Sequence, residues 1–111
     1  MKEGIVMLKI HNGLKDGKSH YDAICGHWRT AAGRLKFIQY TVGINRWNFV
    51  CVFKPSIWGY VETGHEKGRK YFEGVEAPVD MLSKLQEAEV KLLQKFGRGR
   101  ELAYAFLSEV E

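Results

Sequence analysis

The spacing of apolar residues along the chain changes near residue 77. Before that point they come in short runs rich in β-branched and aromatic residues, which is typical of strands. After it they recur at helical spacing, with Lys, Gln and Glu between them. The pattern predicts an α+β protein with an antiparallel sheet of about five strands in residues 4–75, followed by two C-terminal helices at about 78–96 and 100–110.

The sheet region divides into runs separated by turn signals. We expect residues 4–10 to form the first strand, and Asn12-Gly13 and Asp16-Gly17 are strong turn dipeptides. Residues 20–28 are interpreted as the second strand. The next runs are residues 35–42, 47–54 and 57–62, and a short last strand is expected at residues 71–75.

The middle runs predict a meander of three strands with a defined register. A two-residue turn at Ile44-Asn45, or a four-residue loop over residues 43–46, pairs Val42 with Trp47. A second tight turn fits at Pro55-Ser56. This register gathers large side chains on one face: Ile38, Tyr40, Val42, Trp47, Phe49, Cys51, Phe53, Trp58 and Tyr60.

The opposite face of this meander is also mostly apolar, with lighter side chains. Helices can cover one face, but a second apolar face exposed to water is costly. We therefore expect the second apolar face to be covered in one of three ways: the sheet curls toward a half-barrel, a partner chain packs on it, or a ligand binds to it. The alternative is a curled sheet that encloses its aromatic face around a helix and has no surplus surface.

The expected helices follow the sheet. Pro78 suits the start of the first helix and Gly97 its end. Its apolar stripe and that of residues 100–110 both recur at helical spacing: Met81, Leu82, Leu85, Ala88, Leu92 and Phe96, then Leu102, Phe106 and Val110.

Size and composition indicate an ordinary globular domain. The chain has 111 residues, the usual length of one domain, so residues 1–111 are interpreted as a single α+β domain. No apolar run reaches the ~20 residues that span a bilayer, and the first residues do not resemble a signal peptide. The two cysteines lie in apolar runs. We expect a cytoplasmic protein with no membrane partner and no cofactor.

Charge adds a possible partner to this picture. The formal net charge is +4, but residues 1–75 contain 12 Lys and Arg against 6 Asp and Glu, whereas residues 76–111 contain 5 against 7. A basic surface favours anionic partners, above all nucleic acid. The simpler interpretation is that the positive charge only keeps a small protein in solution.

Aromatic and basic residues lie close together in the sheet region. Exposed rings can stack on bases, and a loop with two glycines and several cations, residues 63–70, can grip phosphate. This loop lacks the spacing of a Walker motif, and a solvated hairpin loop is the alternative. The residues expected to contact nucleic acid are Arg29, Arg34, Lys36, Arg46, Trp47, Lys54, Trp58, Tyr60, His65, Lys67, Arg69 and Lys70.

Cysteine and histidine give a weaker hypothesis. His20, Cys25, His27 and Cys51 could complete a tetrahedral zinc site, although their spacing matches no common zinc motif. Cys25 with His27 could also be a nucleophile and its base, but side chains at i and i+2 of a strand stand about 6.5–7 Å apart. No catalytic residue is assigned.

These observations favour a small intracellular nucleic-acid-binding protein. The first alternative is a protein-interaction module, either a homodimer or an accessory or inhibitory factor that uses the surplus apolar sheet face. The second is a small metal-dependent or Cys/His-dependent enzyme.

Overall fold

The computed structural model describes residues 4–26, 28, 35, 37–65, 67–96 and 102–106. Within them the chain forms a five-stranded sheet in the order β4-β3-β2-β1-β5. The elements in chain order are β1 (Gly4–Lys9), α1 (His11–Lys15), α2 (His20–Ile24), β2 (Tyr40–Asn45), β3 (Asn48–Tyr60), β4 (Lys70–Glu76), α4 (Val79–Glu87), α5 (Glu89–Leu93) and β5 (Leu102–Phe106).

The sheet is mixed, with one parallel pair of strands. β1 runs parallel to β2, and α1 and α2 lie in the connection between them. β2, β3 and β4 form two successive antiparallel hairpins, and β5 returns antiparallel to the other side of β1. The predicted α+β class, a sheet of five strands and two helices after the meander are confirmed, although the fifth strand comes from residues 102–106 and not from residues 4–75. The sheet is predominantly antiparallel and is not closed.

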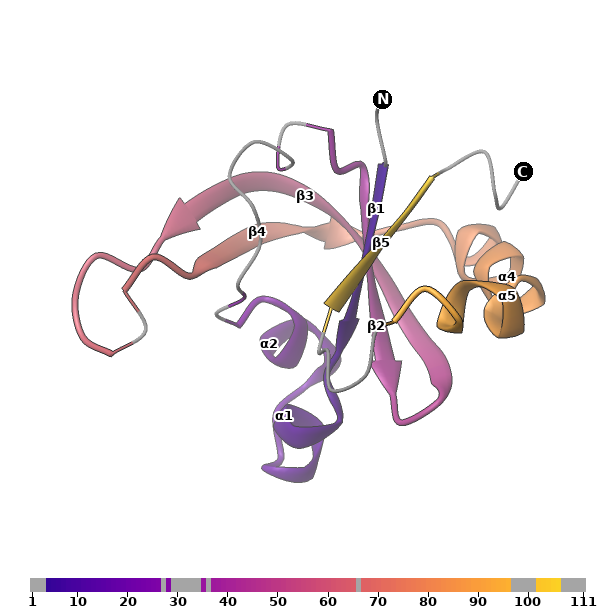
Figure 1. Ribbon diagram of the computed structural model, residues 1–111, viewed down its shortest axis with the longest axis horizontal. Helices are drawn as coiled ribbons and strands as arrows, with labels where there is room; N and C mark the ends of the chain where they lie inside the picture. Colours follow the sequence, from indigo (N-terminus) through magenta and orange to yellow (C-terminus); the bar gives the residue numbers. More distant parts are fainter. Residues whose placement is uncertain are drawn as a thin grey trace.

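Helices pack on both faces of the central strands (Figure 1). α4 and α5 cover one face, and α2 covers the other. The core below α4 and α5 contains Ile5, Met7, Val42, Ile44, Phe49, Val52, Met81, Leu85 and Leu92. The core on the α2 side contains Val6, Leu8, Ile10, Ala23, Ile24, Trp28, Cys51, Phe53 and Phe72. The apolar second face of the central sheet is thus covered by a helix that the sequence pattern did not predict.

β3 and β4 extend beyond these helices as a curved two-stranded ribbon (Figure 1). We call this β3–β4 hairpin, from Lys54 to Glu76, the arm. One of its faces continues the core on the α2 side through Trp58 and Phe72. Ile57, Tyr71 and Val75 are exposed. Among the described strand residues, the exposed large apolar side chains therefore lie in the arm.

The prediction of a strand at residues 20–28 is wrong. These residues begin with α2, because the Ser19 hydroxyl accepts a hydrogen bond from the Asp22 backbone N–H at 3.1 Å and caps the helix. Trp28 then forms an isolated antiparallel bridge with Lys70, and its indole Nε1 donates to the Ile24 carbonyl at 2.8 Å. The segment covers a sheet face instead of extending the sheet.

The predicted hairpin register is also wrong. The turn lies at Arg46-Trp47, Asn45 pairs with Asn48, and Val42 pairs with Val52 after a register shift. The second predicted turn is absent, because Pro55 remains inside β3 at an irregularity in its pairing with β4. The bulges divide the predicted aromatic face between two cores, so that Phe49 packs under α4 and α5 whereas Phe53 packs on the α2 side.

The C-terminal predictions had mixed outcomes. The helix expected at residues 78–96 is confirmed as two successive helices, α4 and α5. The helix expected at residues 100–110 is wrong for residues 102–106, which form β5. Alternation explains this strand, because Ala103 and Ala105 face one core whereas Leu102 and Tyr104 pack against the other. In the described part of the chain, no helix is both long and apolar enough to cross a membrane.

Candidate functional site

Seven of the residues predicted to bind nucleic acid fall into two groups at opposite ends of β3. Arg46 and Trp47 form the turn that precedes β3. Tyr60 ends β3, and His65, Lys67, Arg69 and Lys70 follow it around the arm. At ~3.3 Å per residue, about 40 Å of strand separates the groups. Arg29, Arg34 and Lys36 lie outside the described residues.

Arg46 and Trp47 form the tip of the β2–β3 hairpin. The flanking residues Asn45 and Asn48 pair with each other, so the tip contains only two residues. Arg46 has a φ of 63°, the left-handed region that glycine favours and that costs another residue about 1–2 kcal/mol. The Trp47 side chain is 66% exposed. The turn therefore projects a cation and a large ring into solvent.

Lys9 connects this turn to the segment after α5. Its ammonium Nζ lies 5.6 Å from the centroid of the Trp47 ring and 4.8 Å from that of Phe96. Distances below about 6 Å permit cation–π attraction. We call Lys9, Arg46, Trp47 and Phe96 the turn platform. Lys9 and Phe96 were not predicted from the sequence, because only the folded chain brings β1 and the segment after α5 beside the turn.

The first residues of β3 are held firmly behind the turn platform. Phe49 is buried, its backbone N–H donates to Glu89 Oε1 at 3.3 Å, and its carbonyl accepts from Gln86 Nε2 at 3.0 Å. These bonds attach the strand to α4 and α5, whose own apolar side chains pack in the same core. The position of Trp47 is thus fixed by covalent connection to an anchored strand.

The arm contains a second pairing of an aromatic ring with a cation. Tyr60 is 52% exposed, and Lys70 Nζ lies 5.6 Å from its ring centroid. The connecting loop has glycines of positive φ, Gly64 at 87° and Gly68 at 92°, and its exposed side chains include His65 and Lys67. The Val61 backbone N–H donates to the Arg69 carbonyl at 2.9 Å, and the Gly68 N–H donates to the Val61 carbonyl at 2.9 Å, so both backbone groups of Val61 close the hairpin.

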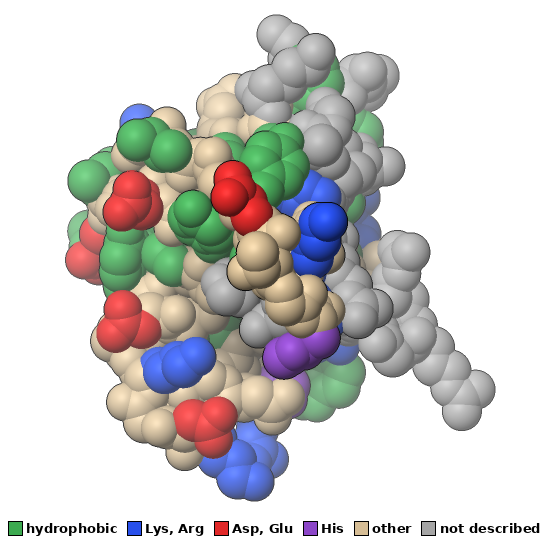
Figure 2. All heavy atoms as spheres, turned by 90° about the vertical axis from the view of Figure 1, so that its left-hand side faces the viewer, with side chains coloured by type: hydrophobic (Ala, Val, Ile, Leu, Met, Phe, Trp, Pro, Cys, Tyr) green, Lys and Arg blue, Asp and Glu red, His purple; other side chains and the backbone are tan. Residues whose placement is uncertain are grey.

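The arm is electrically balanced. Residues 54–76 contain four Lys and Arg and four Glu, so their formal charge is zero with histidine neutral. Figure 2 views the molecule from the side of the arm, where acidic, hydrophobic and histidine side chains lie among the Lys and Arg side chains. The equal numbers of basic and acidic residues in the arm weaken its attraction for phosphate groups.

Lys54 and Trp58 lie between the two groups. Lys54 is exposed, and its ammonium is 6.0 Å from the centroid of the Tyr40 ring. The half-buried Trp58 ring packs against Phe72, with 5.1 Å between ring centroids and a tilt of 51°. Trp58 therefore contributes mainly to the packing of the arm.

The cysteines do not form a reactive site in the described part of the chain. Both are free thiols. Burial raises the pKa of Cys25, and nearby carboxylates add to the effect. Burial raises the pKa of Cys51 to about 12, so its thiol remains protonated at neutral pH. Among the described residues, no three His, Cys, Asp or Glu side chains are grouped to hold a metal ion, and His27 of the zinc hypothesis is outside them.

Comparison with protein-family models, with curated proteins and with solved structures finds no match for this chain. We therefore infer its function from its own residues.

Proposed function

We propose that this protein binds single-stranded nucleic acid at the turn platform. In this proposal a base stacks on Trp47, while Arg46 and Lys9 contact phosphate groups. The single observation that supports it best is the 66% exposure of a tryptophan placed beside Arg46 at the tip of a two-residue turn.

An exposed ring favours a nucleic-acid strand with unpaired bases. Stacking of a base on an aromatic side chain contributes about 1–3 kcal/mol, and it requires a base whose ring face is accessible. Trp47 offers most of its surface to solvent, and the nearby ammonium of Lys9 supplies positive charge. A duplex keeps its bases stacked internally, so it would engage only the cations.

The backbone at Arg46 gives a second argument. An arginine in the left-handed region is strained, and glycine would fit this turn better. Strain that the fold does not require is concentrated at functional sites in many proteins. A role for the exposed Arg46 side chain in binding explains why a strained residue occupies this position.

Titration of labelled oligonucleotides tests the proposal. Fluorescence anisotropy would be measured with a single strand and the matched duplex at about 50 and about 200 mM salt. We expect the single strand to bind more tightly, with an affinity that falls with salt at a slope of about 0.7 per phosphate contact. Absence of binding at the lower salt concentration would overturn the proposal.

Two aromatic variants then locate the site. Trp47→Ala should weaken single-strand binding by about fivefold to a hundredfold, the range that loss of one stacking contact gives. Tyr60→Ala is the matched control, because it removes an exposed ring beside a lysine at the other end of β3, and we expect less than about a twofold change. Equal effects of both variants would move the site away from the turn platform. Urea unfolding of both proteins verifies that the fold is retained.

A second candidate function is protein binding through the outer face of the arm. Ile57 is 62% exposed and Val75 is 63% exposed, and Tyr71 is 39% exposed on the same strand as Val75. Ile57 pairs with Glu73, so Tyr71 and Val75 lie two residues to either side on that face. Light scattering coupled to size exclusion tests self-association. A dimer that Ile57→Lys dissociates would support this function, whereas a concentration-independent monomer would exclude a homodimer.

A further inference from the structure

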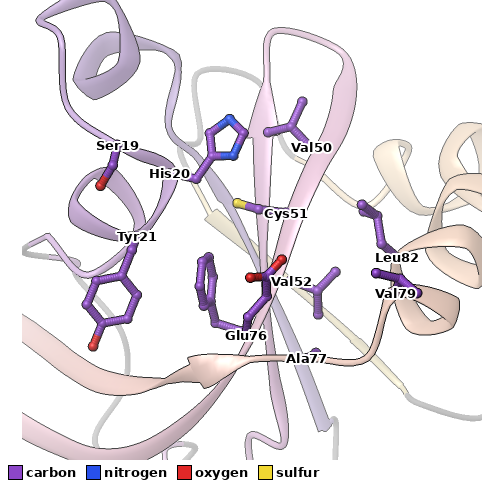
Figure 3. A pocket seen from close by; sticks show the side chains of 11 residues that line it. Ser19, His20, Tyr21, Val50, Cys51, Val52, Glu76, Ala77, Val79 and Leu82 are labelled. Atoms are coloured by element: carbon purple, nitrogen blue, oxygen red, sulfur yellow. The ribbon is translucent and has the colours of Figure 1, made fainter.

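A pocket of about 300 Å³ lies at the place where β4 leaves β3. It is open to solvent and is lined by the start of α2, the middle of β3, the end of β4 and the start of α4 (Figure 3). Val52, Val79 and Leu82 contribute apolar walls. The pocket shares no residue with the turn platform, so it is a separate site. Its volume is at the small end of the range for ligand pockets, about 300–1,000 Å³.

The polar groups of the pocket are few and differ in character. Glu76 is the one Asp, Glu, Lys or Arg side chain among the described lining residues. In Figure 3 its carboxylate points toward the sulfur of Cys51, and the imidazole of His20 lies on the other side of that sulfur. The Glu76 carboxylate contributes to raising the pKa of the Cys51 thiol, after the larger effect of burial. With histidine neutral, Glu76 gives the described lining of the pocket one formal negative charge.

We propose that this pocket binds a small organic cation, a primary ammonium group on a short apolar body. The ammonium group lies at the Glu76 carboxylate, and the apolar body packs against Val52, Val79 and Leu82. An anionic ligand would be repelled by Glu76, and a neutral ligand would bind through the apolar walls alone. This site is independent of nucleic-acid binding.

The test compares three ligands of similar size and different charge. The probes are 2-phenylethylamine, 2-phenylethanol and 3-phenylpropionate, titrated into ¹⁵N-labelled protein and followed by amide chemical shifts. We expect the amine to shift the amides of Val50, Val52 and Ala77. The alcohol should bind about threefold to fivefold more weakly, the contribution of a partly exposed ion pair, and the carboxylate should bind more weakly still.

A pair of charge variants identifies the carboxylate. Glu76→Gln should reduce the affinity for the amine to that for the alcohol. Glu76 and Glu73 are both exposed, so replacing either with Gln should leave the fold intact. Glu73→Gln is the matched control, because Glu73 lies on the same strand and does not line the pocket. The affinity of this variant for the amine should equal that of the native protein.

Three results would overturn the proposal. They are the absence of amide shifts at the pocket with about 10 mM amine, equal affinities for amine and alcohol in the native protein, and an unchanged preference for the amine in Glu76→Gln. Loss of oligonucleotide binding by Trp47→Ala has no bearing on these measurements, so the two proposals fail separately.

Discussion

The two ends of β3 carry the same kind of side-chain pair in different surroundings. At the turn, Trp47 lies beside Lys9, and in the arm Tyr60 lies beside Lys70. The turn end is anchored, because the Phe49 backbone is bonded to Gln86 and Glu89. The arm end has a core on one face and exposed apolar side chains on the other.

An exposed ring near a cation therefore does not identify a binding site by itself. Whether an aromatic ring and a nearby cation can bind phosphate depends also on the net charge around them and on how firmly their strand is held. Residues 54–76 carry as many acidic as basic side chains, so the field that would attract phosphate is cancelled locally. Around Trp47, the turn residue Arg46 adds a further cation on an anchored strand.

The largest expected effect concerns the support of the arm. Phe72 is 1% exposed and packs against Trp58, so Phe72→Ala should reduce the free energy of unfolding by about 3–5 kcal/mol in urea. Amides of the arm should lose hydrogen-exchange protection before those near Phe49. A loss below about 1 kcal/mol would mean that the arm contributes little to global stability and unfolds locally.

Alkaline pH tests the packing nearer the turn end, where Cys51 is buried. Its pKa is raised to about 12 in the folded protein, whereas an unfolded thiol titrates near 8.5. The folded state therefore disfavours the thiolate, and this contribution is complete below about pH 8.5 and is lost as pH rises toward 12. We expect the difference in unfolding free energy between native protein and Cys51→Ala to narrow by about 1.4 kcal/mol per pH unit in that window. A constant difference would contradict the burial of the thiol.

Glycine substitutions test the paired strands of the arm at Gly74 and its connecting loop at Gly64. A Cβ at Gly74 would overlap the Lys54 carbonyl oxygen and lie 2.8 Å from Pro55 Cα, and backbone atoms cannot move aside easily. We expect Gly74→Ala to destabilise the protein by about 1–3 kcal/mol in thermal or urea unfolding. Gly64→Ala meets no atom within 4 Å and should cost only about 1 kcal/mol, through its positive φ. The reverse ranking would contradict the β3–β4 register.

The smallest expected effect is an increase in stability. Arg46→Gly removes the strain of a left-handed arginine but gives the unfolded chain more freedom, so we expect a gain of about 0.5–1 kcal/mol. The same variant should lower the salt dependence of oligonucleotide binding by about 0.7, the share of one phosphate contact. A more stable protein with unchanged salt dependence would remove Arg46 from the proposed site.

The sequence predicted those strands and helices that depend on residues close together in the chain. The first strand, the strand at residues 71–75 and the helical segment after Pro78 needed only the apolar spacing and the helix start. Ser19 and Asp22 carried a capping signal for α2 that the apolar run around them obscured. Residues 102–106 have apolar side chains at every position, so their spacing fits either a helix or a strand, and pairing with β1 decides between them.

The candidate site was predicted only in part, because long-range contacts assemble it. Arg46 and Trp47 were identified from their residue types and their place near a turn. The register of β2 and β3 depends on a shift between Gly43 and Ile44, which no local signal specified. Lys9 and Phe96 come from distant segments, and the pocket at Glu76 depends on where β4 separates from β3.

The position of β1 has a consequence for the order in which the chain can fold. β1 lies between β2 and β5, so the strand synthesised first receives one of its neighbours from residues 102–106. Contacts so far apart in sequence slow folding, because a long loop must close before they form. During synthesis on the ribosome, Ile5 and Met7 cannot pair with Ala105 and Ala103 until those residues have been made. Until then, the backbone N–H and C=O groups on one side of β1 are unpaired and can bind chaperones or neighbouring chains.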